Sequence, residues 1–312
     1  MNQDKALAAA QRRKKTIKLL KESWPFYILI APALIYILIF SYGPMYGLQI
    51  AFKDYRASKG IWGSDWAGLK HFIRFVTFPN FGKYMWNTMR INLIDLIFWP
   101  CGIIFALLLN EIRNQKFKKM VQMITYIPHF LTEVVVCALV ILFLDRTTGP
   151  IMALVEFLGG EPASLMSEPK AFPWIYVLSG VWQGLGWSTI LYISALSAVS
   201  SEQVEAAEID GASRFQVMRH VYIPGIMPTI VITLIMKMGS ILGVGYTKVL
   251  LLQNDLNLDT STVLGTYTYQ VGLRGGQYSY SSAIGLFNNL INIALLLISN
   301  FVAKKVSDTS LF

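Results

Sequence analysis

Long apolar runs separated by short polar segments dominate the hydropathy pattern of this chain. A helix needs roughly 20 apolar residues to cross a hydrocarbon core of about 30 Å. Six runs reach that length, at about residues 25–50, 86–110, 123–144, 172–199, 225–250 and 280–303. The first run is too long for a secretory signal peptide, and no small-residue cleavage site follows it cleanly. The pattern therefore predicts an all-α membrane protein with six transmembrane helices.

Composition and charge support this interpretation and indicate an orientation. Hydrophobic residues make up 54% of the chain and charged residues only 14%, which is atypical of a soluble domain. The net charge is +9, and basic residues gather beside the spans, mainly in the tail 1–24, the 110–120 connection and the end 304–312. Because cytoplasmic loops contain the excess of Lys and Arg, we expect both termini in the cytoplasm. Because this charge is spread over the ends of the spans and not over one folded basic face, contact with anionic membrane lipid explains it better than binding of nucleic acid does.

One polar segment, between the predicted fourth and fifth spans, differs from an ordinary connection. Ser200 with Gln203, and Ser213 with Gln216, have the spacing of a capping box, which predicts two short helices. Gly211 stands between them, where a helix end favours a residue that tolerates positive φ. The segment also holds several small and several acidic side chains. Another protein's backbone could therefore approach it closely, and a basic cleft could hold it.

This segment resembles the EAA coupling loop of binding-protein-dependent ABC importer permeases. The resemblance rests on Glu-Ala-Ala, Asp-Gly-Ala and Ile-Pro within residues 205–224, followed by Pro228, with Ile223 where the usual pattern has Leu. It implies a helix that seats in a groove of a cytoplasmic ATPase. The residues that it implies in ATPase coupling are Glu205, Ala206, Ala207, Asp210, Gly211, Ala212 and Pro224. An ordinary juxtamembrane linker is the alternative interpretation.

The resemblance also implies a fold, partners and a location. The fold is that of a type I ABC importer permease (MetI-like), with six spans at 25–303, a transport core at about 85–303 and a coupling loop at 200–224. The motif G-x-x-G-S-x-W-x-G-L-x-x-F at 60–72 is similar to that of oligosaccharide permeases. The implied assembly, in a bacterial cytoplasmic membrane, holds a second permease subunit, two ATP-binding cassette ATPase subunits, an extracytoplasmic sugar-binding protein and an oligosaccharide substrate. We expect no cofactor in this chain, since ATP and Mg²⁺ would be bound by the partner ATPase.

No catalytic or metal-binding pattern stands out. Gly82-Lys83 lacks the preceding Gly and the following Ser or Thr of a phosphate-binding loop. The three histidines lie on separate segments without metal-ligand spacing, at His71, His129 and His220. Both cysteines fall inside predicted spans, where packing explains them. The sequence thus indicates a transport subunit and not an enzyme.

Polar side chains inside the spans are candidates for a substrate pathway, because lipid does not tolerate them facing outward. In the sixth span, two asparagines share one face at 100° per residue. In the fourth, aromatic side chains occur together with hydrogen-bonding groups, a combination that suits the apolar faces and hydroxyls of sugars. The candidate pathway residues are Trp182, Gln183, Trp187, Tyr192, Ser240, Tyr246, Asn288 and Asn292. Hydrogen bonding and close packing between helices is the alternative for each of them.

Three charged residues, Asp95, Glu133 and Lys237, lie well inside predicted spans. An unpaired charge there would cost about 3 kcal/mol or more, so pairing among them is one interpretation. An ion-coupled secondary carrier would use such groups too. Against a carrier stand the coupling segment and the lack of an evident inverted repeat between the two halves of the chain. A membrane scaffold that binds partners without moving solute is a third hypothesis.

Overall fold

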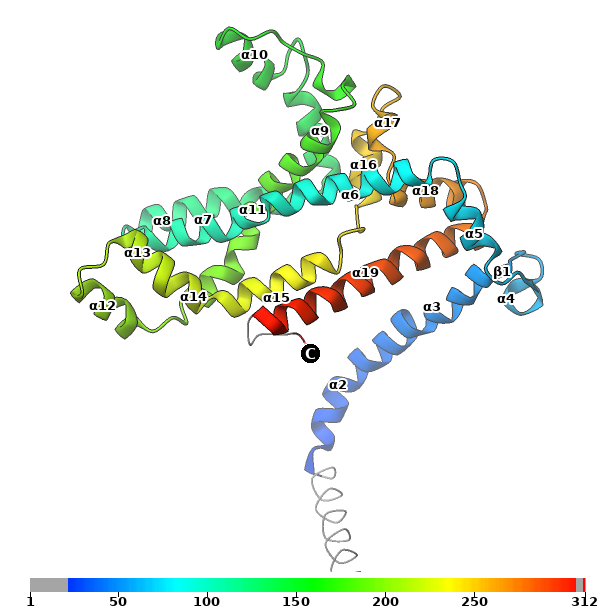
Figure 1. The fold of residues 1–312 in the computed structure, drawn as a ribbon, viewed down its shortest axis with the longest axis horizontal. Helices are drawn as coiled ribbons and strands as arrows, with labels where there is room; N and C mark the ends of the chain where they lie inside the picture. The colour runs from blue at the N-terminus through cyan, green and yellow to red at the C-terminus, as the bar shows by residue number, and fades with distance from the viewer. Residues whose placement is uncertain (1–21, 307–310, 312) are drawn as a thin grey trace, which may run out of the picture. The chain divides into compact units, whose positions relative to one another are not determined.

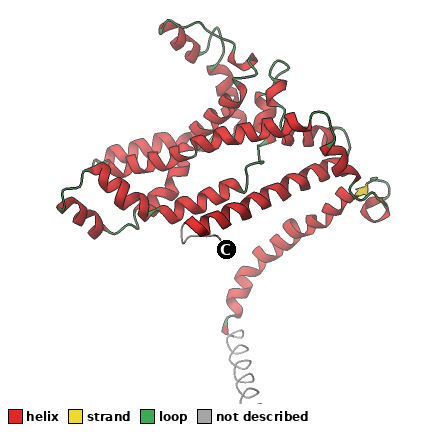
Figure 2. Ribbon diagram, viewed as in Figure 1, coloured by secondary structure: helices red, strands yellow, loops and turns green. Residues whose placement is uncertain are grey.

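The computed structural model describes residues 22–306 and Leu311, and most of them are helical (Figures 1 and 2). The cytoplasmic tail predicted at 1–24 and the end predicted at 304–312 lie mostly outside these residues. The chain divides into two units, one ending at Gly68 and the other beginning at Leu69.

The first unit is a long apolar helix followed by a small hairpin. Helix α2 (Trp24–Ile37) continues through η1 (Leu38–Tyr42), α3 (Gly43–Met45) and η2 (Tyr46–Phe52). No residue of α2 is buried in the chain, as expected for a helix that is apolar on all sides and faces lipid or other subunits. Strands β1 (Lys53–Asp54) and β2 (Asp65–Trp66) pair antiparallel around α4 (Gly60–Gly63), with Lys53 opposite Trp66. These strands depart from the all-α prediction, but they lie outside the predicted spans.

The second unit contains the remaining predicted spans. It begins with α5 (Lys70–Val76), α6 (Phe81–Phe98), α7 (Pro100–Glu111), α8 (Gln115–Tyr126), η3 (Ile127–Phe130), α9 (Glu133–Phe143), α10 (Pro150–Phe157), η4 (Leu165–Ser167) and α11 (Phe172–Leu196). It continues with α12 (Ser201–Ile209), α13 (Arg214–Val217), η5 (Met218–Tyr222), α14 (Ile223–Gly225), α15 (Met227–Met238), α16 (Tyr246–Leu252), α17 (Leu258–Ser261), α18 (Leu264–Tyr269), η6 (Gln270–Arg274) and α19 (Tyr278–Val306).

The number of spans depends on how bent helices are counted. Three helices of the described chain are long and apolar enough to cross a membrane: Trp24–Phe52, Phe81–Glu111 and Tyr278–Lys305. Two bent pairs qualify if each is one span, namely Gln115–Phe130 with Glu133–Phe143 and Arg214–Gly225 with Met227–Met238. Helix α11 is not among them, although its 25 residues reach about 37 Å at 1.5 Å per residue. The helical membrane fold is confirmed, and the count of six stays a prediction.

Helix α11 is the central element of the second unit and packs against α6, α7 and α8. Glycines permit the close approach that drives helix association in lipid. A Cβ built on Gly102 of α7 would lie 2.6 Å from the Ser188 hydroxyl of α11. A Cβ on Gly186 of α11 would lie only 2.3 Å from the backbone oxygen of Thr125 in α8. Gly102 thus makes room for a side chain of α11, whereas Gly186 lets α11 approach the backbone of α8 directly.

Three buried apolar clusters hold the second unit together. One joins α6, α11 and α16 around Ile91, Val177 and Val249. Another joins α7 and α11 to the start of the fifth span around Ile103, Leu196 and Ile226. The third joins α5 to α18 and α19 around Phe75, Leu264 and Ile284. The second cluster connects the segment after α13 to α7 and α11.

The close contact at Gly186 gives a prediction about stability. We expect Gly186→Ala to lower the thermal stability of the detergent-solubilised protein, because the added methyl meets a backbone oxygen that cannot move aside cheaply. Overpacking of this kind costs about 1 to 3 kcal/mol. The measurement is the unfolding temperature followed by tryptophan fluorescence.

The matched control is Gly184→Ala, one half-turn away on the same helix. A Cβ there meets nothing within 4 Å, so the unfolding temperature should stay the same or rise with the better helix propensity of Ala. Equal behaviour of the two variants would show that α8 and α11 do not make this contact.

Candidate functional site

Two of the spans in the second unit are interrupted, and the interruptions face each other across one cavity. In the first, η3 ends at Phe130 and α9 begins at Glu133 with a bend of 103°. Thr132 caps α9, since its hydroxyl accepts from the Val135 N–H. The free carbonyl of Leu131 accepts a hydrogen bond from the Gln183 side chain of α11 at 3.0 Å. Lipid offers no partner for such a carbonyl, so a side chain of the neighbouring helix must supply one.

The second interruption separates α15, which ends at Met238, from α16, which begins at Tyr246. Two asparagines of α19 complete its backbone hydrogen bonds. The Leu242 N–H donates to Asn292 Oδ1 at 3.0 Å, and Asn288 Nδ2 donates to the Leu242 carbonyl at 3.2 Å. Both amides predicted to line a pathway thus have backbone partners within the chain. This arrangement fits the packing interpretation, and their contact with substrate stays a prediction.

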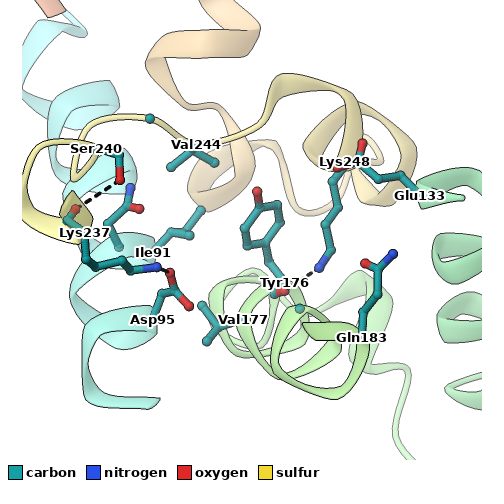
Figure 3. Close-up of a pocket in the computed structure, with 13 residues that line it drawn as sticks. Ile91, Asp95, Glu133, Tyr176, Val177, Gln183, Lys237, Ser240, Val244 and Lys248 are labelled. Carbon is teal, nitrogen blue, oxygen red and sulfur yellow. Dashed lines mark hydrogen bonds and ion pairs between the residues drawn. The ribbon is translucent and has the colours of Figure 1, made fainter. Parts of the chain in front are cut away.

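A polar cavity of about 300 Å³ lies between the two interruptions (Figure 3). Its wall combines α6, α9, α11, α15 and α16 with the segment that joins α15 to α16. The polar and charged residues that line it are Asn92, Asp95, Glu133, Tyr176, Gln183, Lys237, Ser240 and Lys248. Two of the predicted pathway residues, Gln183 and Ser240, are therefore brought together here.

Four charged residues line this cavity, and two of them form an ion pair with each other. Lys237 of α15 forms an ion pair with Asp95 of α6, shown by a dashed line in Figure 3. The expected pairing of charges inside the spans is confirmed for these two residues. Glu133, at the first position of α9, forms no ion pair with any residue that the structure describes. Lys248 of α16 is only 6% exposed and donates a hydrogen bond to the Tyr176 carbonyl at 2.9 Å.

The other predicted pathway residues lie elsewhere. Tyr192 is buried and shares a hydrogen bond with Thr233 at 3.0 Å, while Trp187 stacks on His129 with ring centroids 4.3 Å apart. Trp182 lines an apolar cavity of about 630 Å³ beside α9 and α10. Tyr246 and Asn288 line another cavity, of about 360 Å³, against α18 and η6. The predicted set is therefore divided among several places, and only part of it borders the charged cavity.

Sequence reasoning did not single out Lys248 or Tyr176. Lys248 lies two residues from the predicted end of the fifth span, where a lysine is normally explained as an anchor at the membrane surface. The clue was the Gly-rich stretch from Gly239 to Gly245, which breaks the span earlier and turns Lys248 back into the protein. Short or Gly-interrupted apolar segments are typical of binding sites in transporters.

The polar segment after α11 forms the predicted pair of short helices. Helix α12 ends in a Schellman motif, in which the Ala212 N–H donates to the Ala207 carbonyl and the Gly211 N–H to the Glu208 carbonyl. Gly211 has φ +79°, as its position between the helices predicted. The Ser213–Gln216 capping box is present. Ser200 makes no capping hydrogen bond, so the capping box predicted for Ser200 and Gln203 is wrong, although the helix itself forms.

The exposed face of this segment is partly apolar. Ile209 is 85% exposed and Phe215 is 67% exposed, on either side of the Gly211 turn. Glu205, Ala206, Asp210 and Gly211 are also exposed, whereas Ala207 and Ala212 are half-buried. Pro224 lies in α14, directly after the wider π turn η5, which accommodates a residue without an N–H. Six of the seven predicted coupling residues thus lie in α12 or the turn that follows it, and Pro224 lies apart from them on α14.

A metal site is not indicated in the described part of the chain, where no group of three His, Cys, Asp or Glu side chains converges. The two cysteines are unpaired there, with Cys137 buried and Cys101 half-buried.

Comparison with known proteins places the chain in a family. Residues 99–308 match the model of the binding-protein-dependent transport system inner membrane component. The polygalacturonan/rhamnogalacturonan transport system permease protein YteP of Bacillus subtilis is 41% identical over 97% of this chain and 94% of its own length. Protein LplB of Bacillus subtilis is 40% identical, covering 94% of this chain and 92% of its own.

A solved structure agrees with these sequence relatives. It is the crystal structure of a bacterial alginate ABC transporter in complex with an alginate pentasaccharide-bound periplasmic protein. One of its chains superposes with a TM-score of 0.85 at 32% identity, covering 94% of this chain and 99% of that one. The resemblance first carried by the polar segment therefore holds over the whole length of the transport core, and the chain belongs to the binding-protein-dependent ABC transporter permeases, the inner membrane components of these systems.

Proposed function

We propose that this chain is the membrane permease subunit of an ATP-driven importer of oligosaccharides. The observation that supports this function most directly is the match to the permease family over residues 99–308. In the proposed assembly, two ATPase subunits bind and hydrolyse ATP with Mg²⁺ in the cytoplasm. A second permease subunit completes the pore, and an extracytoplasmic binding protein delivers the sugar. The chain spans the bacterial cytoplasmic membrane with both termini inside.

The substrate class follows from the relatives and from the cavity. YteP is named for polygalacturonan and rhamnogalacturonan, and the solved relative holds a protein bound to an alginate pentasaccharide. The cavity between the interrupted spans offers amide, hydroxyl and charged groups, which suit the hydroxyls of a sugar. We therefore assign the substrate of this chain to fragments of polysaccharides.

Coupling in this mechanism begins at the turn formed by α12 and α13. Ile209 and Phe215 supply exposed apolar side chains that a groove on the ATPase would cover. The Schellman motif and the Ser213 capping box fix the turn, so that it moves as one body. The open and closed states of the ATPase pair would bind the turn with different affinities. Closure of the pair around ATP would therefore displace the turn.

Movement of the turn would be transmitted to the cavity through the helices that follow it in the chain. The helix from Arg214 to Gly225 continues directly from the turn, and its residues Met218 and Tyr222 pack against the cluster around Ile103 and Leu196. A bend of 63° then leads into α15, whose Lys237 is paired with Asp95 at the cavity wall. Movement at the turn would therefore shift α15 against α6 and change access to the cavity. This alternation of access is the proposed transport step.

The coupling assignment predicts the effect of Gly211→Leu. The left-handed backbone at Gly211 costs about 1 to 2 kcal/mol for other residues, so the turn should distort. We expect the variant to insert normally but to lose capture of the ATPase subunit and sugar uptake. Pull-down of the ATPase and uptake of labelled oligosaccharide are measured on the same membranes.

The matched control is Gly159→Leu. Gly159 has φ +83° and nothing within 4 Å of an added Cβ, as at Gly211, but it lies in the connection after α10. Its variant should retain ATPase capture. Normal capture and normal uptake in Gly211→Leu would refute the role of the turn.

A second prediction separates support of the broken span from contact with sugar. Asn292→Ala leaves the Leu242 N–H without its partner, so the free energy of unfolding should fall by about 1 to 3 kcal/mol. Ser240 is exposed in the cavity and donates only to the Lys237 carbonyl of its own turn. Ser240→Ala should keep the unfolding temperature but change sugar-stimulated ATPase activity of the full complex.

Both variants are tested with both readouts, so that each serves as the control of the other. If Asn292→Ala keeps full stability while Ser240→Ala loses it, the assignment of these two residues is reversed.

A further inference from the structure

Lys248 is buried against α11, unlike a lysine that anchors a helix at the membrane surface. Its side chain extends from α16 toward α11, and Figure 3 shows its amino group directed at the Tyr176 carbonyl. The ammonium also lies 4.7 Å from the centroid of the Tyr176 ring. A Cβ on Gly180 would lie 3.2 Å from Nζ, so the missing side chain at Gly180 makes room for the charge. Neighbouring helices thus hold the ammonium at the cavity wall.

No residue that the structure describes forms an ion pair with this ammonium. Its hydrogen bond and its ring contact involve only neutral groups of Tyr176. Asp95 is already engaged by Lys237, and Glu133 borders the cavity without forming an ion pair to Lys248. A buried ammonium without a direct ion-pair partner is costly, so it is usually retained for a purpose. An ammonium has three donors, and one carbonyl occupies only one of them.

We propose that Lys248 binds the carboxylate of an acidic sugar, so that the cavity favours oligosaccharides built from uronic acids. This inference rests on the proposed function and adds a substrate class to it. A carboxylate accepts charge-assisted hydrogen bonds, which are about twice as strong as those of a neutral hydroxyl. Gln183 and Ser240, which border the same cavity, are placed for the ring hydroxyls next to that carboxylate. The cavity has a volume of about 300 Å³, so it holds only a short part of the oligosaccharide at a time.

The test compares trigalacturonate with its fully methyl-esterified form, which keeps the sugar rings and removes the negative charges. Stimulated ATPase activity and uptake are measured in proteoliposomes containing the complete transporter and its binding protein. The quantity of interest is the acid preference, defined as the ratio of the two activities. We expect Lys248→Gln, which keeps a donor toward the Tyr176 carbonyl, to lower this preference about tenfold. Lys248→Arg should retain it.

Lys116→Met is the charge-matched control, because it removes one lysine at the exposed start of α8, away from the cavity. It should leave the acid preference unchanged. Using one binding protein throughout cancels the contribution of that protein to the ratio. If Lys248→Gln fails to assemble, Gly180→Ala displaces the ammonium without removing it and should lower the same ratio.

The outcomes separate the two proposals. A wild-type complex that responds to neutral oligosaccharides but shows no acid preference overturns the role of Lys248 and leaves the importer function standing. The role is also overturned if the assembled Lys248→Gln or Gly180→Ala variant keeps the wild-type preference. A complete complex stimulated by no oligosaccharide of either kind overturns the importer function, and the inference with it.

Discussion

The backbone of a membrane-spanning segment must find all its hydrogen-bond partners within the protein, and this constraint organises the second unit. Two spans are interrupted there, and each interruption exposes backbone groups that the helix no longer satisfies. Gln183 of α11 supplies a donor to Leu131, and Asn288 and Asn292 of α19 complete Leu242. The polar side chains inside the spans therefore have a structural reason to be there before any substrate is considered.

The same interruptions create the cavity. A continuous helix would present only side chains to its neighbours, whereas a broken one opens space between its two halves. Ser240 lies within one break and Lys248 follows it, while Glu133 follows the other break. The ion pair between Lys237 and Asp95 then neutralises two of the charges at this wall. The polar site thus combines residues at the ends of interrupted helices with residues from within α6 and α11.

The sequence allowed much of the fold to be predicted and part of the site. The hydropathy runs located α11 and α19 closely, and the spacing of Ser213, Gly211 and Gln216 predicted the shape of the polar turn. These features depend on local periodicity and capping, which sequence encodes directly. The family followed from that turn, and the comparisons confirmed it.

The arrangement of the site could not be read in the same way. Hydropathy joins α15 and α16 into one run, because the Gly-rich break between them is itself apolar. Lys248 was consequently not singled out, and Trp187, Tyr192 and Gln183 were grouped together although they contact His129, Thr233 and Leu131. Which neighbour a polar side chain meets depends on helix rotation and bending, and these are set by tertiary packing.

The most direct test is an electron cryomicroscopy structure of the complete complex, trapped with a non-hydrolysable ATP analogue and with oligosaccharide bound. The account predicts that α12 and the Gly211 turn lie in a groove of the ATPase, with Ile209 and Phe215 covered. It also predicts sugar density against Gln183, Ser240 and Lys248. An α12 left in solvent, or a sugar path that avoids the cavity between the two interrupted spans, would contradict it.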